Sequence, residues 1–199
     1  LPRRSLSAPE LELADVDGDG LPDLVEIDDT IRYWRNLGDG EFDHPREMDA
    51  GPSGLSLADP EVQLLDADGD GRVDLVSFHD DLAGYFPLSH DGEWAEERFQ
   101  PYDALPSVSL DDPEVKRIDL DGDGVTDAVR AGESLECFFQ DREDGWTETR
   151  TVAKESFDDV ASISFADDRV DLADMTGDGL LDVVFVDAGH VSYWPNQGH

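Results

Sequence analysis

The apolar positions of this chain fall in short runs separated by turn residues, a pattern that predicts β-strands rather than helices. In the first fifty residues these runs are Leu11–Ala14, 24–27 and Ile31–Trp34, and a fourth strand is expected to begin at Glu41–Phe42. Clusters of Gly, Asn and Asp separate the runs, and no apolar period of 3.6 residues is sustained over ten residues. We therefore expect hairpins of short antiparallel strands.

A nine-residue acidic motif interrupts the strand pattern four times, beginning at Asp15, Asp66, Asp119 and Asp174. The four copies read DVDGDGLPD, DADGDGRVD, DLDGDGVTD and DMTGDGLLD, and their starts are 51, 53 and 55 residues apart. About twenty residues after each start comes an aromatic pair and then a polar turn. The pairs are Tyr33-Trp34, Tyr85-Phe86, Phe138-Phe139 and Tyr193-Trp194.

Repeats of about fifty residues, each with several short strands and recurring aromatics, predict the blades of a β-propeller. The expected fold is all-β, with about four blades of four antiparallel strands, since blades must stack to bury both faces of their sheets. The repeats are placed at about 11–50, 62–103, 115–153 and 170–199, and residues 1–10 are expected to add a strand to the last or a preceding blade. A closed small ring and a segment of a larger propeller both remain open.

The acidic motif has the chemistry of a calcium loop, because Ca²⁺ takes six to eight oxygen ligands and Asp residues at positions 1, 3 and 5 can point at one centre. Gly at positions 4 and 6 lets the backbone turn around that centre. The carbonyl at position 7 and the Asp at position 9 would complete the shell. The expected ligands are Asp15, Asp17, Asp19, Leu21 and Asp23; Asp66, Asp68, Asp70, Arg72 and Asp74; Asp119, Asp121, Asp123, Val125 and Asp127; and Asp174, Thr176, Asp178, Leu180 and Asp182.

The first three loops are the strong candidates, and the fourth is weaker because the Thr176 hydroxyl is a poorer ligand than a carboxylate. The competing interpretation is an ordinary Asp-Gly turn, which would not need four mutually repelling carboxylates in nine residues. An EF-hand is rejected, because it needs a Glu at position 12 and flanking helices. That position holds Glu26, Ser77, Arg130 and Phe185. We expect the calcium to be structural and to clamp the two strands that each loop joins.

The net charge of −36 argues against nucleic acids and anionic membranes as partners, since both are polyanions. Such an excess of Asp over Lys is also typical of proteins adapted to high salt, where charges are screened. No apolar run approaches the length that spans a bilayer, so direct membrane insertion is not expected.

Catalysis is not indicated, and we expect a protein that is not an enzyme. The five histidines, at positions 44, 79, 90, 190 and 199, stand in no recognised nucleophile or metal spacing. Cys137, the only cysteine, lies in a predicted strand and is read as a packed thiol. Trp34, Trp94, Trp146 and Trp194 could stack on sugars, but their recurrence in register favours core positions between blades.

The loops resemble the calcium loops of FG-GAP and VCBS-type propeller repeats. Three stretches carry a more specific resemblance: 110–114 with the loop at 119–124, the segment VDLADMTGDGL at 170–180, and the YWPN segment at 193–196. Together they are similar to the propeller region of the B component of insecticidal toxin complexes (Tc toxins) and of SpvB-type virulence proteins. The resemblance covers about residues 11–199.

The resemblance implies a docking and gating propeller in an exported assembly with toxin A and C components, although a cytoplasmic location stays open. The alternative interpretation is a calcium-dependent adhesin or lectin-like binding module.

Overall fold

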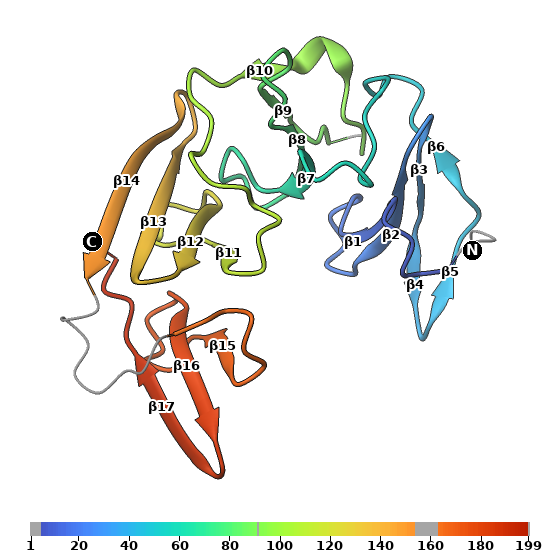
Figure 1. Ribbon diagram of the computed structural model, residues 1–199. Coiled ribbons are helices and arrows are strands. Elements are labelled where there is room, and N and C mark those ends of the chain that lie inside the picture. The colour runs from blue at the N-terminus through green and yellow to red at the C-terminus, as the bar shows by residue number, and fades with distance from the viewer. Residues whose placement is uncertain (1–4, 91, 154–162, 199) are drawn as a thin grey trace. The chain divides into compact units, whose positions relative to one another are not determined.

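The computed structural model describes residues 5–90, 92–153 and 163–198 of the chain. The chain divides into two compact units, Leu1–Asp103 and Ala104–His199, which are described one at a time. The strands of each unit are labelled in Figure 1.

The first sheet of the first unit contains four antiparallel strands in the order β1-β2-β3-β6. These are β1 (Leu11–Ala14), β2 (Asp23–Ile27), β3 (Ile31–Trp34) and β6 (Arg46–Glu47). The strand expected at Glu41–Phe42 forms as β5, but it does not join this sheet. It pairs instead with β4 (Asn36–Gly38), because positive φ angles at Gly38, Asp39 and Gly40 turn the chain back tightly. The fourth place in the sheet falls to β6, which pairs with β3.

The second sheet of this unit has the order β10-β9-β8-β7. Its strands are β7 (Val62–Leu65), β8 (Asp74–Ser77), β9 (Gly84–Phe86) and β10 (Gln100–Pro101), and the short 3₁₀ helix η1 (Glu96–Arg98) precedes β10. Gly84 has a φ of +150°, and a Cβ there would lie 2.1 Å from the Gln100 carbonyl oxygen. Only glycine therefore allows β9 and β10 to approach so closely.

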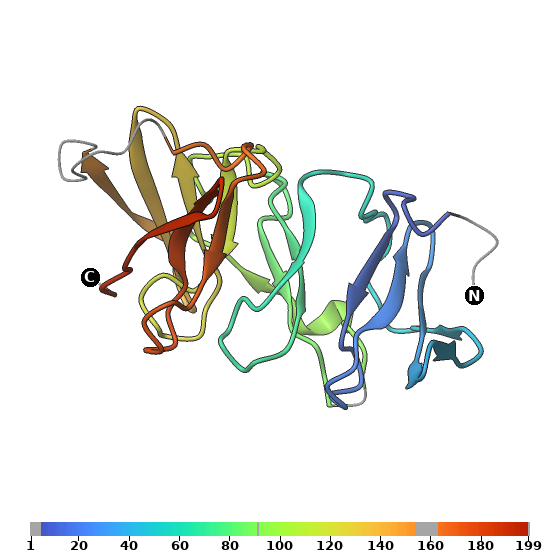
Figure 2. The ribbon, with the colours of Figure 1, turned by 90° about the horizontal axis from the view of Figure 1, so that it is seen from below.

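The second unit repeats the arrangement with one sheet of four strands and one of three. The four-stranded sheet is β11 (Val115–Ile118), β12 (Asp127–Ala131), β13 (Ser134–Asp141) and β14 (Gly145–Ala153). The three-stranded sheet is β15 (Val170–Ala173), β16 (Asp182–Asp187) and β17 (His190–Trp194). Figure 2 gives a second view of these hairpins, with β15, β16 and β17 side by side as their pairing requires. The predicted all-β, propeller-type fold of about four antiparallel blades is confirmed, with three strands rather than four in the last sheet among the described residues.

The four sheets share one register, in which a Val two residues after the end of the acidic loop pairs with the third strand. The pairs are Val25 with Tyr33, Val76 with Tyr85, Val129 with Cys137 and Val184 with Tyr193. The aromatic pair Phe138-Phe139 is therefore displaced by one position, and Phe138 pairs with Ala128 as Trp34 pairs with Leu24. The expectation that all four aromatic pairs are in step was wrong for the third repeat, where Cys137 takes the tyrosine position.

The core of the first unit is densely filled between its two sheets. Tyr33, Leu75, Phe86 and Trp94 are all buried in one apolar cluster. In the second unit the matching cluster is more open, because Cys137, Phe139, Val183 and Trp194 are only partly buried. A cavity of 370 Å³ lies there, lined by side chains from β11, β12, β13 and β14 on one side and from β15, β16 and the end of β17 on the other.

Residues 5–10 form turns and not the strand expected over residues 1–10, of which the first four lie outside the described residues. The Ala8 N–H donates to the Ser5 carbonyl and the Leu11 N–H to the Ala8 carbonyl. Pro9 has no N–H to give to a strand ladder, which favours the turn.

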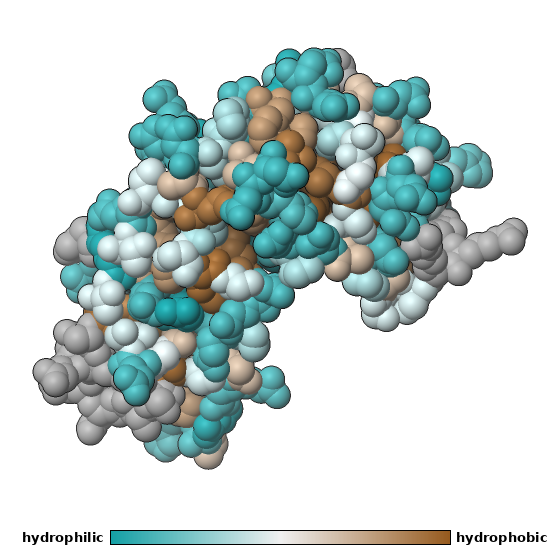
Figure 3. All heavy atoms as spheres, turned by 45° about the horizontal axis from the view of Figure 1, so that its top comes forward, coloured by the Kyte–Doolittle hydropathy of each residue, from teal (hydrophilic) through white to brown (hydrophobic). Residues whose placement is uncertain are grey.

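No helix among the described residues is long and apolar enough to cross a membrane. Hydrophilic side chains cover much of the face shown in Figure 3, in keeping with the net charge of −36.

Candidate metal sites

The first Asp of each acidic loop organises the loop by accepting hydrogen bonds from its glycines. The Gly18 N–H donates to Oδ1 of Asp15 at 2.8 Å, and the Gly20 N–H donates to Oδ2 at 2.8 Å. Both glycines have φ near +80°, a conformation that side-chain-bearing residues rarely adopt. The same pair of bonds recurs from Gly69 and Gly71 to Asp66, from Gly122 and Gly124 to Asp119, and from Gly177 and Gly179 to Asp174.

The ninth residue of each loop is a fully buried Asp. Its carboxylate connects the loop to the chain at the end of the third strand of the sheet. Oδ2 of Asp74 accepts from the Ala67 N–H at 3.0 Å, and Oδ1 accepts from the Leu88 N–H at 3.0 Å. Asp23, Asp127 and Asp182 occupy the same position, also with at most 1% of their surface exposed. They bind the N–H groups of Val16 and Asn36, of Leu120 and Gln140, and of Met175 and Asn196.

Burial strongly raises the pKa of two of these anchoring carboxylates, Asp74 and Asp127. Desolvation raises the pKa of Asp74 to about 7, against the opposing effect of the N–H bonds from Leu88 and Ala67. Desolvation likewise raises the pKa of Asp127 to about 7. A divalent ion beside these groups would favour the ionised form and pull their pKa values down again. Sequence reasoning treated the ninth Asp only as a ligand and missed its structural role.

The second loop holds its first three acidic side chains together. Asp66, Asp68 and Asp70 each offer an oxygen, and the three oxygens lie within 4.8 Å of one another. Such a set of hard, negatively charged oxygens fits Ca²⁺, which would satisfy carboxylates that otherwise repel one another. Burial and the neighbouring carboxylates raise the pKa of Asp66, although two glycine N–H bonds oppose them.

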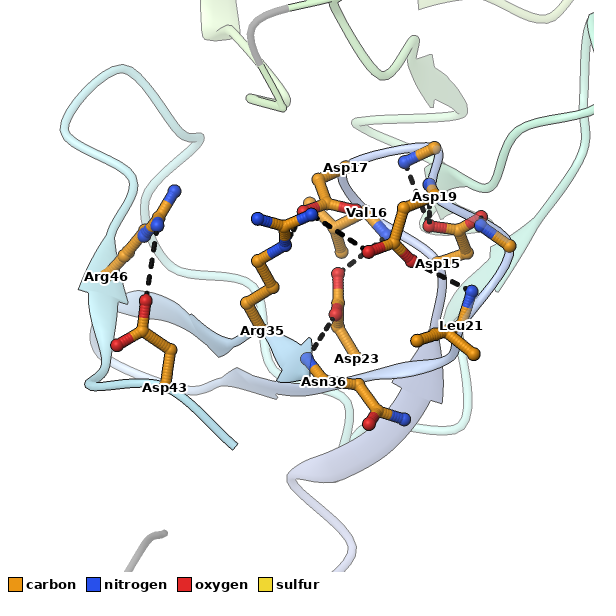
Figure 4. A network of polar contacts seen from close by, with 12 residues as sticks. Asp15, Val16, Asp17, Asp19, Leu21, Asp23, Arg35, Asn36, Asp43 and Arg46 are labelled. Atoms are coloured by element: carbon orange, nitrogen blue, oxygen red, sulfur yellow. Dashed lines mark hydrogen bonds and ion pairs between the residues drawn. The ribbon is translucent and has the colours of Figure 1, made fainter. Parts of the chain in front are cut away.

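In the first loop, Asp15, Asp17 and Asp19 converge in the same way, but a guanidinium lies among them. Arg35 forms ion pairs with Asp17 and with Asp19, the latter at 2.9 Å between Nη2 and Oδ2 (Figure 4). The Leu21 N–H and the Arg35 side chain together lower the pKa of Asp19. The chain thus supplies its own cation to this loop, and nothing in the spacing of the motif predicted it.

The third loop brings together Asp119, Asp121 and Asp127, so the ninth Asp and not the fifth joins the cluster. Asp123 accepts the Val125 N–H at 2.7 Å, as the fifth Asp of the other loops does from the seventh residue, and its own carbonyl accepts from Nη2 of Arg142 at 2.7 Å. In the fourth loop the described residues form no such three-ligand cluster. There the Thr176 hydroxyl lies 3.5 Å from Oδ1 of Asp174, and hydrogen bonds from Gly177 and Gly179 lower the pKa of Asp174.

The seventh residue of each loop donates its N–H to the fifth Asp, as Leu21 does to Asp19 at 2.9 Å. Arg72, Val125 and Leu180 do the same to Asp70, Asp123 and Asp178. Whether their carbonyls also bind a metal stays a prediction.

The Arg72 side chain has a further role, because its guanidinium donates to the carbonyls of Ser89 and Leu88, and more weakly to that of Val16 in the first loop. Beside it lies a polar cavity of 380 Å³, lined by parts of both loops and by His90.

The tryptophans predicted as core residues are buried in three of four cases. Trp34, Trp94 and Trp146 have at most 6% of their surface exposed, and Trp194 lines the cavity of the second unit. Cys137 is partly buried, and desolvation raises the pKa of its thiol. This environment disfavours the reactive thiolate and agrees with a packing role.

Comparisons with known proteins support the repeat assignment. Residues 11–77 match the FG-GAP-like repeat family. A chain of the Tc holotoxin pore of Photorhabdus luminescens is 31% identical over 96% of this chain, with a TM-score of 0.74. The resemblance to a Tc toxin propeller region is confirmed. This chain spans only 9% of the length of that toxin chain.

The fold is also found outside Tc toxins. An Agrocybe aegerita lectin that recognises non-reducing terminal N-acetylglucosamine is 23% identical over 94% of this chain and 49% of its own, with a TM-score of 0.60. At this identity the likeness shows the shared fold alone. Comparison with curated proteins gives no match.

Proposed function

We propose that this chain is a non-enzymatic, calcium-binding propeller scaffold that works as a docking and gating part of a Tc-type toxin assembly. The convergence of Asp66, Asp68 and Asp70 within 4.8 Å carries the calcium part of this proposal. The 31% identity to a chain of a Tc holotoxin pore supports the assembly part.

The loops are expected to differ in their affinity for calcium. The second loop has three convergent carboxylates, and the third has three with Asp127. In the first loop an entering ion must displace Arg35 from Asp17 and Asp19. In the fourth, Thr176 replaces a carboxylate. We therefore propose two strong sites, a weaker one in the first loop, and the weakest in the fourth.

A calcium titration of the chelated chain, followed by thermal unfolding, tests the metal. At a calcium concentration a hundredfold above the dissociation constant, binding to the folded state adds about 2.7 kcal/mol. For a chain of this size the midpoint should rise by about 5 °C or more. Asp68→Asn should remove most of the shift from the second loop, whereas Asp80→Asn, an acidic change outside the loops, should not. An unchanged midpoint in millimolar calcium at moderate salt would contradict structural calcium.

The assembly role is tested by binding to purified toxin A and C components. We expect the chain, within its full-length protein, to form a complex with both. Failure to associate with either component, with calcium present, would leave a free-standing calcium scaffold as the better description. An exported location follows from the same proposal and is checked by fractionating the producing cells.

A further inference from the structure

A second cluster of metal-binding side chains lies outside the acidic loops. In the second sheet, Asp59 and Glu61 lie just before β7, and His79 lies two residues after β8. One ligand atom from each of the three lies within 4.8 Å of the other two. Nδ1 of His79 is 2.8 Å from Oε2 of Glu61, and Nε2 is 3.3 Å from Oδ2 of Asp59.

We propose that Asp59, Glu61 and His79 bind a divalent transition-metal ion, with Zn²⁺ as the representative case. An imidazole nitrogen with two carboxylate oxygens suits Zn²⁺ and its neighbours, whereas Ca²⁺ prefers oxygen alone. Ligand bonds to zinc are about 2.0–2.2 Å long, so three ligands around one ion lie within about 4.4 Å of each other. In the structure the two carboxylates face different ring nitrogens of His79, so binding one ion requires one carboxylate to rotate toward the nitrogen that the other faces.

The site is distinct from the calcium loops because of the topology of the hairpin. The acidic loop joins the end of β7 to the start of β8, whereas this cluster lies at the opposite, open end of the same two strands. Four residues of strand separate the two ends, or about 13 Å. An ion bound at one end would therefore share no ligand with an ion bound at the other.

Backbone hydrogen bonds fix the chain around the three side chains. The Phe78 N–H donates to the Glu61 carbonyl at 2.8 Å, extending the β7–β8 ladder to the residue beside His79. Asp59 closes a turn in which its carbonyl accepts the Val62 N–H at 3.0 Å. Its Oδ1 accepts the Glu61 N–H at 3.0 Å, which leaves Oδ2 as the oxygen facing His79. Ligands presented by strand ends and a tight turn need little reordering when a metal binds.

In two other repeats, the residue just before the first strand also takes part in polar contacts with nearby side chains. In the fourth repeat, Arg169 occupies the position of Glu61 and pairs with Asp167 at 2.7 Å and Asp187 at 3.8 Å. In the third repeat, Glu114 accepts from the Ser164 hydroxyl and the Phe165 N–H. Guanidinium, hydroxyl and amide donors of this kind serve as internal partners. In the second repeat the partner of the two carboxylates is an imidazole, which is also the commonest protein ligand for transition metals.

The test is a Zn²⁺ titration of the whole chain in the presence of excess CaCl₂, which occupies the acidic loops. We expect one Zn²⁺ to bind per chain, and His79→Gln to weaken binding by at least about tenfold. The matched control is His44→Gln, which removes an exposed histidine beside Asp43 that belongs to no such cluster. Co²⁺ in place of Zn²⁺ gives a second readout, since its visible spectrum should report nitrogen ligation in the parent and lose it in His79→Gln.

Two outcomes of the titration would overturn the proposal. If the calcium-saturated parent binds no Zn²⁺, or if His79→Gln binds it as tightly as the parent, the site does not exist. Circular dichroism and the calcium response of each variant show whether it is folded. If His79→Gln fails that check, Glu61→Gln takes its place with the same expected loss. Neither result depends on the toxin assembly. The count of one Zn²⁺ per chain requires calcium to fill the loops, whereas the loss of affinity in His79→Gln is expected with or without calcium there.

Discussion

In the first unit Tyr33 fills the space between two sheets, whereas in the second unit Cys137 stands at the same register position. Tyr33 is buried, and a Cβ placed on Gly92, in the turn that follows β9, would lie 3.9 Å from its hydroxyl. Cys137 lines a cavity of 370 Å³ that faces Leu172, Val183 and Trp194 of the next sheet. At the same register position, a tyrosine packs between the sheets of the first unit and a cysteine lines a cavity in the second, although the backbone pairing is the same.

The outer face of the last sheet continues the contrast. Val191 and Tyr193 are 56% and 44% exposed, whereas their counterparts in the first sheet are buried or half-buried. The anchoring Asp of each loop is equally buried in both units. The loops are thus built alike, and the difference between the units lies in the packing between sheets.

The largest effect is expected from removing an anchoring carboxylate, and it should differ between the units. Asp74→Ala removes the carboxylate that accepts the buried N–H groups of Ala67 and Leu88, at a cost of about 1–3 kcal/mol for each lost bond. Asp182→Ala should cost about half as much, because Asn196 is half-buried and its N–H can bind water. Urea unfolding of the two variants measures both losses. Equal losses would mean that the second unit is as closed as the first.

The pH dependence of the stability of the calcium-free chain tests the ionisation of two anchoring carboxylates, Asp74 in the first unit and Asp127 in the second. Because the folded-state pKa values of Asp74 and Asp127 are raised to about 7 from an ordinary 3.8, the folded state holds protons that the unfolded state has lost between about pH 4 and 7. The free energy of unfolding should therefore fall as the pH rises through this window, by a few kcal/mol at most.

Calcium should flatten this profile, since it favours the ionised carboxylates. Asp74→Asn should remove the contribution of Asp74 and leave that of Asp127. Unfolding midpoints between pH 4 and 8, with and without chelator, give the measurement. A chelated chain that becomes steadily more stable up to pH 8 would contradict the raised pKa values.

Exchanging Tyr33 and Cys137 should exchange the packing of the two pairs of sheets, so that the first opens and the second fills. Tyr33→Cys opens a cavity in the filled core and should cost about 3 kcal/mol. Cys137→Tyr fills the cavity of the second unit and should add about 1 kcal/mol. Denaturant unfolding gives both values, and Cys137→Ser controls for loss of the thiol. A destabilised Cys137→Tyr chain would show that the second pair of sheets cannot accept the ring.

The smallest effect is expected from releasing the first loop from its internal cation. Arg35→Gln removes two partly exposed ion pairs and should change the stability little. It should nevertheless raise the calcium affinity of the first loop, because Asp17 and Asp19 lose a competitor. Calorimetry should then detect one more tight calcium ion than in the parent. Arg142→Gln, beside the third loop, is the control and should leave the tight-site count unchanged.

Much of the fold could be predicted, because strand periodicity, turn residues and the repeated motif all report local preferences. The displacement of Phe138-Phe139 could not, since an adjacent Cys and two Phe residues fit either register by composition. The anchoring role of Asp23, Asp74, Asp127 and Asp182 could not be predicted, because an Asp that binds a metal and an Asp that accepts backbone hydrogen bonds look the same in a sequence. Arg35 was missed because its contact with the first loop depends on where the third strand ends in space.

The anchoring carboxylates also bear on how the chain acquires its fold. The bonds of Asp23 reach only 7 and 13 residues along the sequence, to Val16 and Asn36. Contacts this local close small loops, so their entropic cost is low and they can form early. Each repeat can thus complete its loop, its hairpin and the exit of its third strand before the next repeat exists. Folding can then proceed blade by blade along the chain, in the order in which a ribosome delivers it.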